Sequence, residues 1–255
     1  MRQADEAAAV DAQQAAVADQ GVKAMIPIGR PFLDYVLSAL ADADCRDVCL
    51  VIGPEHHAVR EYYRRPGLLH RVTVSFAIQD KPIGTADAVL AAEPFVGDDR
   101  FLVMNADNYY PVAAYSALRE LDETGLIGFG RDALLADGQI APERIMKFAL
   151  LDVDARGYLR RIVEKPDEAT ARAMGDAALV SMNLWAFDAG IFEPCRTAPL
   201  SSRGEFEIPV AVQHAIEQYG RTFRTVPMDA SVLDLSSRAD IAGVGDALRD
   251  VDVRL

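Results

Sequence analysis

The first half of the chain alternates short apolar runs with amphipathic segments, and this alternation most limits how it can fold. The apolar runs are rich in Val, Ile, Leu and Phe and end in Gly, Asn or Gln, as buried strands do. They cover residues 47–53, 71–79, 100–105 and 126–130. The amphipathic segments have apolar residues at helical spacing, and several begin with proline. They cover residues 31–43, 54–65, 85–93 and 111–124. Such alternation predicts an α/β fold with a mostly parallel central sheet covered by helices on both faces.

The pattern changes after residue 140. Residues 145–166 indicate two strands joined at the Gly157 turn, which would form an antiparallel extension on one edge of the sheet. The remaining segments predict a strand, a helix ending at Gly220, a strand and a closing helix, at 178–188, 205–220, 222–228 and 237–250. The sequence has no internal repeat, low-complexity linker or clear boundary, so we expect a single domain over residues 1–255.

Composition restricts the class of protein and its partners. With 255 residues, 51% hydrophobic and 25% charged, the chain can bury a full core. Its formal charge of −13 disfavours nucleic acid and anionic membranes, so a phosphorylated substrate would need a basic pocket or a metal. Cys45, Cys49 and Cys195 cannot all pair with one another and fit no common zinc signature. Without an apolar membrane span or a signal-peptide core, the sequence predicts a cytoplasmic protein.

Asp107 directly follows the apolar run of residues 101–105. Functional side chains in open parallel sheets lie at the carboxyl ends of strands, where loops converge and helix N-termini point inward. A carboxylate there can cap the following helix or shape a turn. It can also bind Mg²⁺ that faces phosphate oxygens. The residue alone leaves both interpretations open.

Six segments in order resemble the sugar-phosphate nucleotidyltransferase family, and together they cover nearly the whole chain. They are KAMIPIGRPFLDYVLSAL (23–40), DVCLVIG (47–53), QDKPIGTADAVLAA (79–92), FLVMNADNYY (101–110), RIVEKP (161–166) and ASVLDLSSRADI (230–241). Members of this family join a nucleoside triphosphate to a sugar 1-phosphate and release pyrophosphate. The resemblance implies the nucleotide-diphospho-sugar transferase fold, a Rossmann-like three-layer sandwich. It implies no nucleic-acid or membrane partner and leaves a homo-oligomer open.

The resemblance also assigns residues to the nucleotide. Lys23 matches the lysine that contacts phosphate, where a compact positive charge offsets transferring phosphoryl oxygens. Gln79, Gly84 and Thr85 match the base-recognition loop, since an amide can donate to and accept from a base edge and glycine allows close backbone approach. Without this context Lys23 would be an ordinary solvated lysine. A turn followed by a Thr-capped helix would equally explain Gly84 and Thr85.

Two carboxylates match the family's metal ligands. Asp107 falls at the metal-binding aspartate after the fourth strand, and Asp234 falls in VLDLSS, where the family usually has Trp-x-Asp-x-Gly-Thr. Together they would hold one Mg²⁺ against the α-phosphate and align an in-line displacement. Here Val232 replaces the aromatic residue, and Ser236 and Ser237 replace the Gly-Thr pair. A helix-capping role for Asp234 therefore stays open.

The sugar 1-phosphate is assigned to a third group. Glu164 and Lys165 match the pair that holds the sugar hydroxyls and phosphate, and Asn183 lies where the family often has Asn-x-Gly at the sugar pocket. Glu205 and Glu207 are further candidate sugar contacts, or first-turn acids favoured by a helix dipole. A solvated turn is the alternative for Glu164 and Lys165.

One family feature is missing from the sequence. Members begin with a strand and a Gly-rich loop whose amides hold the triphosphate, whereas Met1 and Arg2 resemble only the end of that loop. We therefore expect the natural polypeptide to begin about fifteen to twenty residues upstream, with a Gly-rich segment that the genomic sequence would reveal. Residues Gln3 to Gln20 would then form an enlarged loop or helix before Lys23.

The sequence leaves two alternatives to an active enzyme of this kind. One is a catalytically impaired homologue that binds sugar phosphate or nucleotide, and the other is a nucleotide-sugar-dependent glycosyltransferase. A clear Asp-x-Asp would favour the latter, and residues 105–107 supply half of one. The base loop suits uridine or thymidine and leaves cytidine and guanosine open. The enzyme hypothesis predicts that Lys23, Asp107, Lys165 and Asp234 converge on one cleft.

Overall fold

The computed structural model describes Gln14, residues 22–136 and residues 140–255. Most of the segment predicted as an enlarged loop, Gln3 to Gln20, therefore lies outside the described residues. The described strands are β1 (Pro27–Ile28), β2 (Arg30–Pro31), β3 (Asp47–Ile52), β4 (Thr73–Ile78), β5 (Phe101–Val103), β6 (Asn108–Tyr109), β7 (Gly125–Phe129), β8 (Ala149–Val153), β9 (Leu159–Val163), β10 (Leu179–Ser181), β11 (Trp185–Phe187), β12 (Arg224–Met228) and β13 (Leu233–Asp234).

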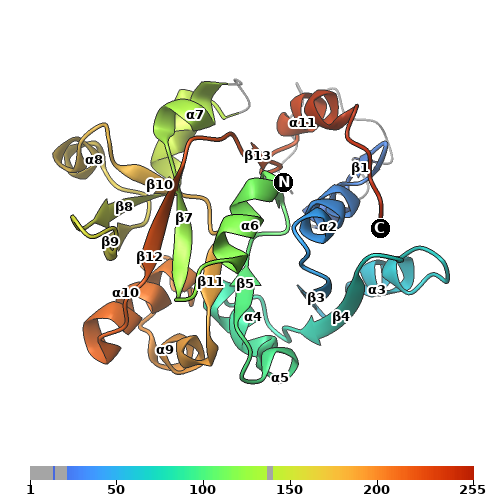
Figure 1. Cartoon of the computed structure of the whole chain (residues 1–255), viewed down its shortest axis with the longest axis horizontal. Coiled ribbons are helices and arrows are strands. Elements are labelled where there is room, and N and C mark those ends of the chain that lie inside the picture. Colours follow the sequence, from blue (N-terminus) through green and yellow to red (C-terminus); the bar gives the residue numbers. More distant parts are fainter. Residues whose placement is uncertain (1–13, 15–21, 137–139) are drawn as a thin grey trace.

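Helices lie between most of these strands, as Figure 1 shows. The α-helices are α2 (Phe32–Asp42), α3 (His57–Tyr63), α4 (Thr85–Ala91), α5 (Glu93–Val96), α6 (Val112–Arg119), α7 (Arg131–Ala136), α8 (Glu168–Met174), α9 (Phe192–Thr197), α10 (Ile208–Tyr219) and α11 (Asp240–Leu248). The short 3₁₀ helices are η1 (Lys23–Met25), η2 (Pro142–Lys147) and η3 (Ala189–Ile191). The four strands and four helices predicted in the first half are confirmed, with ends shifted by a few residues.

The prediction of a mostly parallel central sheet is wrong. The main sheet has seven strands, in the order β5-β11-β7-β10-β8-β9 with β12 also paired to β7. Within it, β12 and β7 are parallel, and the other strand pairs are antiparallel. The antiparallel extension is confirmed, since β8 and β9 pair on either side of the Gly157 turn.

The sheet is mostly antiparallel because a strand from late in the chain lies between two earlier ones. β5 and β7 run in the same direction, as predicted, but β11 inserts between them and runs antiparallel to both. The run at 178–188 also divides into two strands, because Asn183 adopts a positive φ of 59° between β10 and β11. Periodicity identifies a strand, but it does not identify the neighbours of that strand.

Side chains of the central strand β7 alternate between two apolar clusters. Leu126 packs with residues of α4, α9 and α10 on one face of the sheet. Ile127 and Phe129 pack with residues of α2 and α6 on the other face. All five residues of β7 are buried, as expected for a strand covered on both sides, and this accounts for its continuous apolar sequence. Helices therefore cover both faces of the sheet, as predicted.

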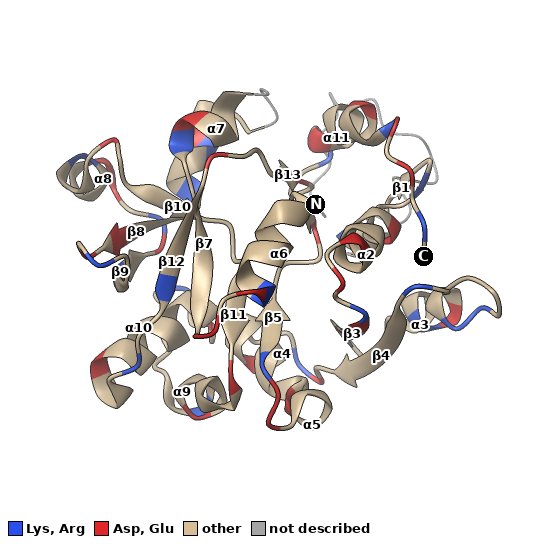
Figure 2. Cartoon of the chain, viewed as in Figure 1, with Lys and Arg blue, Asp and Glu red and all other residues tan. Residues whose placement is uncertain are grey.

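β3 and β4 form a separate parallel pair in register from Asp47 with Thr73 to Ile52 with Ile78. In Figure 1 this pair lies with α2 and α3 on one side of α6, and the seven-stranded sheet lies on the other. In Figure 2, basic residues (blue) lie on several elements, including α7, β12 and the C-terminal segment, and acidic residues (red) are spread over the same parts of the ribbon. Within the described ranges, no helix has the length and apolar character needed to cross a membrane. The three cysteines are free thiols.

Candidate functional site

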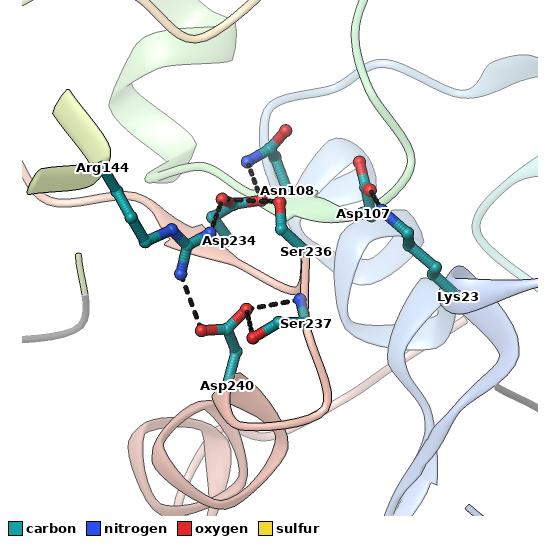
Figure 3. Close-up of polar contacts among 8 residues, drawn as sticks. All are labelled: Lys23, Asp107, Asn108, Arg144, Asp234, Ser236, Ser237 and Asp240. Atoms are coloured by element: carbon teal, nitrogen blue, oxygen red, sulfur yellow. Dashed lines mark hydrogen bonds and ion pairs between the residues drawn. The ribbon is translucent and has the colours of Figure 1, made fainter. Parts of the chain in front are cut away.

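A short antiparallel pair of strands brings Asp107 next to Asp234. β6 begins directly after Asp107, and Asn108 pairs with Asp234 on β13. The backbone N–H of Leu235 donates to the Asp107 carbonyl oxygen at 2.9 Å, which extends the pairing by one residue. The two carboxylates that the sequence assigned to a metal, 127 positions apart, thus come from neighbouring backbone segments. Figure 3 shows both at the same site.

Lys23 also reaches this site. Its Nζ lies 3.1 Å from Oδ2 of Asp107, and both side chains are partly exposed, at 32% and 25%. Lys23 is the first residue of η1, and two contacts with residues of α2 hold the turn that follows η1. The Tyr35 hydroxyl donates to the Ile28 carbonyl at 2.6 Å, and Arg30 pairs with the buried Asp34 at 3.0 Å. The PIGRP segment, residues 27–31, is thus anchored to α2 shortly after Lys23.

Asp234 is almost fully buried and has several hydrogen-bond donors. The Ser236 hydroxyl lies 2.7 Å from Oδ1 and 2.8 Å from Oδ2, and Asn108 Nδ2 donates to Oδ1 at 3.3 Å. Arg144 of η2 donates to Oδ2 of the same carboxylate (Figure 3). Burial raises the pKa of Asp234, and the nearby Asp107 carboxylate raises it further, whereas Ser236 and Arg144 lower it.

Arg144 was missed by sequence reasoning, although it connects three elements of the site. Its second terminal nitrogen lies 2.7 Å from Oδ1 of Asp240, at the start of α11. Asp240 in turn accepts from the backbone N–H and the hydroxyl of Ser237, at 2.6 and 2.9 Å. α11 begins without a side-chain hydrogen bond at its N-cap, so Asp234 does not have the helix-capping role that the sequence left open. No local pattern marks Arg144, because its partners lie about 90 positions away.

The predicted base-recognition residues line a hollow of about 230 Å³, away from the carboxylate pair. Gln79 lies at the end of β4, and its Nε2 donates to the Gly84 carbonyl at 2.9 Å. Gly84 has φ of +135°, and a Cβ atom there would lie 2.2 Å from the carbonyl oxygen of Phe206, so only glycine fits. The hydroxyl of Thr85 accepts from the backbone N–H of Ile208 at 2.9 Å, at the start of α10. Thr85 therefore connects two helices.

One candidate sugar residue, Glu164, lies close enough to this hollow to be affected by the charge of Glu207. Burial raises the pKa of Glu164, and Glu207, which lines the hollow, raises it further. Arg203 forms ion pairs with both Glu205 and Glu207. Both acids precede α10, which has no acidic residue in its first turn, so the interpretation as first-turn acids is wrong. The Lys165 Nζ lies 4.0 Å from Glu164, so the described contacts place Lys165 with Glu164, whereas Lys23, Asp107 and Asp234 form their own group.

Two of the candidate sugar residues have strained backbones. Lys165 and Asn183 have φ of 45° and 59°, in the left-handed region that residues with a side chain adopt at a cost. Asn183 lies next to Met182, whose carbonyl oxygen accepts from the buried Tyr110 hydroxyl at 2.5 Å. Tyr110 follows Asp107 by three residues, so this bond connects the segment between β10 and β11 to the carboxylate site. Such strain is common where a structure must hold a functional side chain in a fixed place.

Comparisons with known proteins identify the family and the fold of the chain. The family model described as nucleotidyl transferase matches residues 17–231. A low-salt glycan biosynthesis nucleotidyltransferase of Haloferax volcanii is 29% identical over 198 residues, which are 77% of this chain and 52% of the relative. A glucose-1-phosphate thymidylyltransferase of Streptomyces antibioticus is 28% identical, over 89% of this chain and 60% of the relative. The chain thus spans little more than half the length of these two relatives.

A solved structure shares the fold. A UDP-glucose pyrophosphorylase in complex with UDP-glucose superposes with a TM-score of 0.73 and 16% identity, over 90% of this chain and 91% of that chain. A UTP-bound enzyme of the same kind from Acinetobacter baumannii gives a TM-score of 0.70 with 18% identity, over 91% and 87%. The matched family model covers most of the chain, including Lys23 and Asp107, and ends before Asp234. The chain therefore belongs to the nucleotidyl transferase family.

Proposed function

We propose that the chain transfers a nucleotidyl group from a nucleoside triphosphate to a sugar 1-phosphate, giving a nucleotide sugar and pyrophosphate. The observation that carries the proposal is the contact of Lys23 with Asp107 beside the β6–β13 pair that holds Asp234. Lys23, Asp107 and Asp234, which the resemblance assigned to phosphate or metal, are far apart in the sequence but close together in the fold. A protein that retained only a binding role would have no need to keep this cation and these two carboxylates together.

Mg²⁺ is the cofactor that we propose for this site. Asp107 and Asp234 offer hard carboxylate oxygens, and Mg²⁺ is commonly held by one or two carboxylates together with substrate phosphates and water. In the described part of the chain, no group of three or more His, Cys, Asp or Glu could hold a metal ion by itself. When bound, Mg²⁺ supplies charge neutralisation and alignment for the displacement. Both oxygens of Asp234 already accept hydrogen bonds, so Asp234 must give up a donor to become a ligand.

The other candidate residues have roles in binding and orientation. Lys23 would offset charge on the phosphoryl oxygens, and the hollow at Gln79 and Gly84 would receive the base. Glu164, Lys165 and Asn183 would hold the sugar 1-phosphate. The three free thiols suit a reducing compartment, and we propose a cytoplasmic enzyme. The names of the relatives suggest testing UTP and TTP with glucose 1-phosphate first.

The test is pyrophosphate release from a panel of nucleoside triphosphates and sugar 1-phosphates in the presence of Mg²⁺. We expect turnover with at least one pair and loss of that turnover in Asp107→Asn. Asp98→Asn, at an exposed carboxylate shortly before β5, is the matched control and should retain the wild-type rate. Binding of triphosphate or sugar phosphate without turnover across the panel would contradict the proposal and favour a binding homologue. Sugar transfer from a nucleotide sugar, without use of any triphosphate, would favour a glycosyltransferase.

A further inference from the structure

Each of the two candidate metal carboxylates has a cation of the chain beside it (Figure 3). Lys23 Nζ lies 3.1 Å from Oδ2 of Asp107, and Arg144 donates to Oδ2 of Asp234. The first pair is partly exposed, whereas the side chains of Arg144 and Asp234 are only 16% and 4% exposed. The two cations together carry the charge that one divalent metal ion would bring.

Arg144 differs from the other donors to Asp234. Asn108 Nδ2 donates to Oδ1 at 3.3 Å, and the Ser236 hydroxyl lies within reach of both oxygens but has one proton for them. Of the donors that the described residues offer to this carboxylate, only Arg144 is charged. A guanidinium and a divalent cation on the same oxygen repel each other, and little water is present to screen them. Arg144 and a metal ion therefore compete for Asp234.

A second acid allows Arg144 to release Asp234 without leaving the site. The other terminal nitrogen of Arg144 lies 2.7 Å from Oδ1 of Asp240. Asp240 is itself held in place, because its Oδ2 accepts from the backbone N–H and the hydroxyl of Ser237 at 2.6 and 2.9 Å. A guanidinium has five donors in a planar fork, so Arg144 can keep Asp240 while another N–H turns to a new acceptor.

A triphosphate supplies such an acceptor, and a free metal ion does not. If Arg144 gave up Asp234 to a free divalent cation, its guanidinium would stay close to that charge with no new anion in exchange, which costs binding energy. Phosphate oxygens accept from a guanidinium in the same bidentate manner as a carboxylate. Arg144 therefore finds a replacement partner only when the metal ion arrives with a triphosphate.

We propose that Arg144 takes the place of the metal charge at Asp234 and passes to a phosphate oxygen when the metal–triphosphate complex binds. Arg144 thereby lets the site take up a divalent cation together with a triphosphate and disfavours the free ion. The inference rests on the proposed nucleotidyl transfer. It goes further, because it gives a role in substrate binding to a residue outside the six segments that resemble the family.

Binding of free Mn²⁺ tests the inference, because Mn²⁺ takes the same oxygen ligands as Mg²⁺ and its paramagnetic resonance separates free from bound ion. We expect Arg144→Gln to bind free Mn²⁺ at least about tenfold more tightly than the wild type, since the competing charge is removed. The matched control is Lys147→Gln, which removes an exposed charge from the same 3₁₀ helix and should change this affinity less than about twofold.

The sign of the change separates this role from a merely structural one. If Arg144 only held Asp234 in place, Arg144→Gln would bind free Mn²⁺ more weakly than the wild type or equally well, and either result would overturn the inference. If Arg144→Gln does not fold, Arg144→Lys decides, because lysine keeps the charge but lacks the fork that holds both acids. It should bind free Mn²⁺ about threefold more tightly than the wild type, and no gain would overturn the inference.

The metal–triphosphate complex should respond differently. Calorimetric titration with Mn²⁺–UTP and Mn²⁺–TTP, without an acceptor sugar, should show Arg144→Gln binding the complex no more tightly than the wild type. The reason is that the lost phosphate contact offsets the lost competition. An equal gain in affinity for the free ion and for the complex would overturn the inference. Binding of neither complex by the wild type would also overturn it.

Pyrophosphate release keeps the inference separate from the proposed function. A wild type that disfavours free Mn²⁺ relative to Arg144→Gln, and binds the Mn²⁺–nucleotide complex without any turnover, would support the inference and contradict the proposed function. Turnover by a wild type that binds free Mn²⁺ as tightly as Arg144→Gln would do the reverse.

Discussion

Replacing Arg144 with alanine tests how the carboxylate site is held together. Arg144 connects η2 to Asp234 on β13 and to Asp240 on α11. Its side chain is 16% exposed, and those of Asp234 and Asp240 are 4% and 10% exposed. Arg144→Ala would leave two poorly solvated carboxylates without the cation between them. Asn108, Ser236 and Ser237 would remain as donors, but none of them has a charge.

The size of the effect follows from this burial. Removing one partner of a buried ion pair costs about 3–5 kcal/mol, and the residual exposure of Arg144 favours the lower end, about 3 kcal/mol. For a chain of this size, each kcal/mol shifts Tm by about 2–4 °C, so we expect a decrease of about 6–12 °C. The pH dependence has a definite sign. Loss of Arg144 raises the pKa of Asp234 further, so the folded variant binds more protons than the unfolded chain above the ordinary aspartate pKa. Its deficit in stability should therefore be smallest at low pH and grow as pH rises.

Equilibrium urea unfolding at several pH values, with thermal unfolding beside it, measures this effect. The control is Arg249→Ala, which removes an exposed pair with Asp246 and should change the free energy of unfolding by about 0.5 kcal/mol or less. Added Mg²⁺ should raise the Tm of Arg144→Ala more than that of the wild type, because Oδ2 of Asp234 has lost its charged donor and keeps only the Ser236 hydroxyl. A loss under about 1 kcal/mol for Arg144→Ala, or a loss independent of pH, would refute the reasoning.

Three further predictions concern the other parts of the site. Asp107→Asn should lower turnover at least about a hundredfold. It should change the free energy of unfolding by less than about 1 kcal/mol, because the ion pair of Asp107 with Lys23 is partly exposed. Steady-state kinetics and urea unfolding measure the two effects, and nearly normal turnover would contradict the prediction. Gly84→Ala should lower the free energy of unfolding by about 3 kcal/mol or more, because the new Cβ meets the Phe206 backbone. Gly67 has φ of +74° and open space around it, so Gly67→Ala should lower it by only about 1 kcal/mol. Similar Tm values for the two variants would rule out the clash. Burial and Glu207 raise the pKa of Glu164, so the folded protein holds extra protons above the ordinary glutamate pKa of about 4.3, and its stability falls as pH rises through the window up to the raised value. Glu164→Gln removes this fall, so it should be slightly more stable at neutral pH, by less than about 1 kcal/mol, while its KM for sugar 1-phosphate increases; unfolding curves with the same pH slope as the wild type would disprove this.

Local sequence patterns were enough to predict the type of most elements, and the resemblance to a family was enough to select candidate site residues. Apolar runs such as 126–130 and amphipathic segments such as 31–43 are local signals. The residues within one short segment are enough to show whether a strand or one face of a helix is apolar and will be buried. The order of short motifs likewise selected Lys23, Asp107 and Asp234, which the structure brings together. Gln79 and Gly84 were found in the same way, and they line one hollow.

The tertiary structure decided which of these elements and residues become neighbours. β11 lies between β5 and β7, so a sheet that the chain order predicted to be mostly parallel is mostly antiparallel. Arg144 contacts Asp234 across 90 positions, and no periodicity or motif encodes such a contact. Gln79 Nε2 likewise donates to Asp87, eight residues away in the next helix. Pairing and charge compensation depend on distances in space, and those distances exist only after the chain has folded.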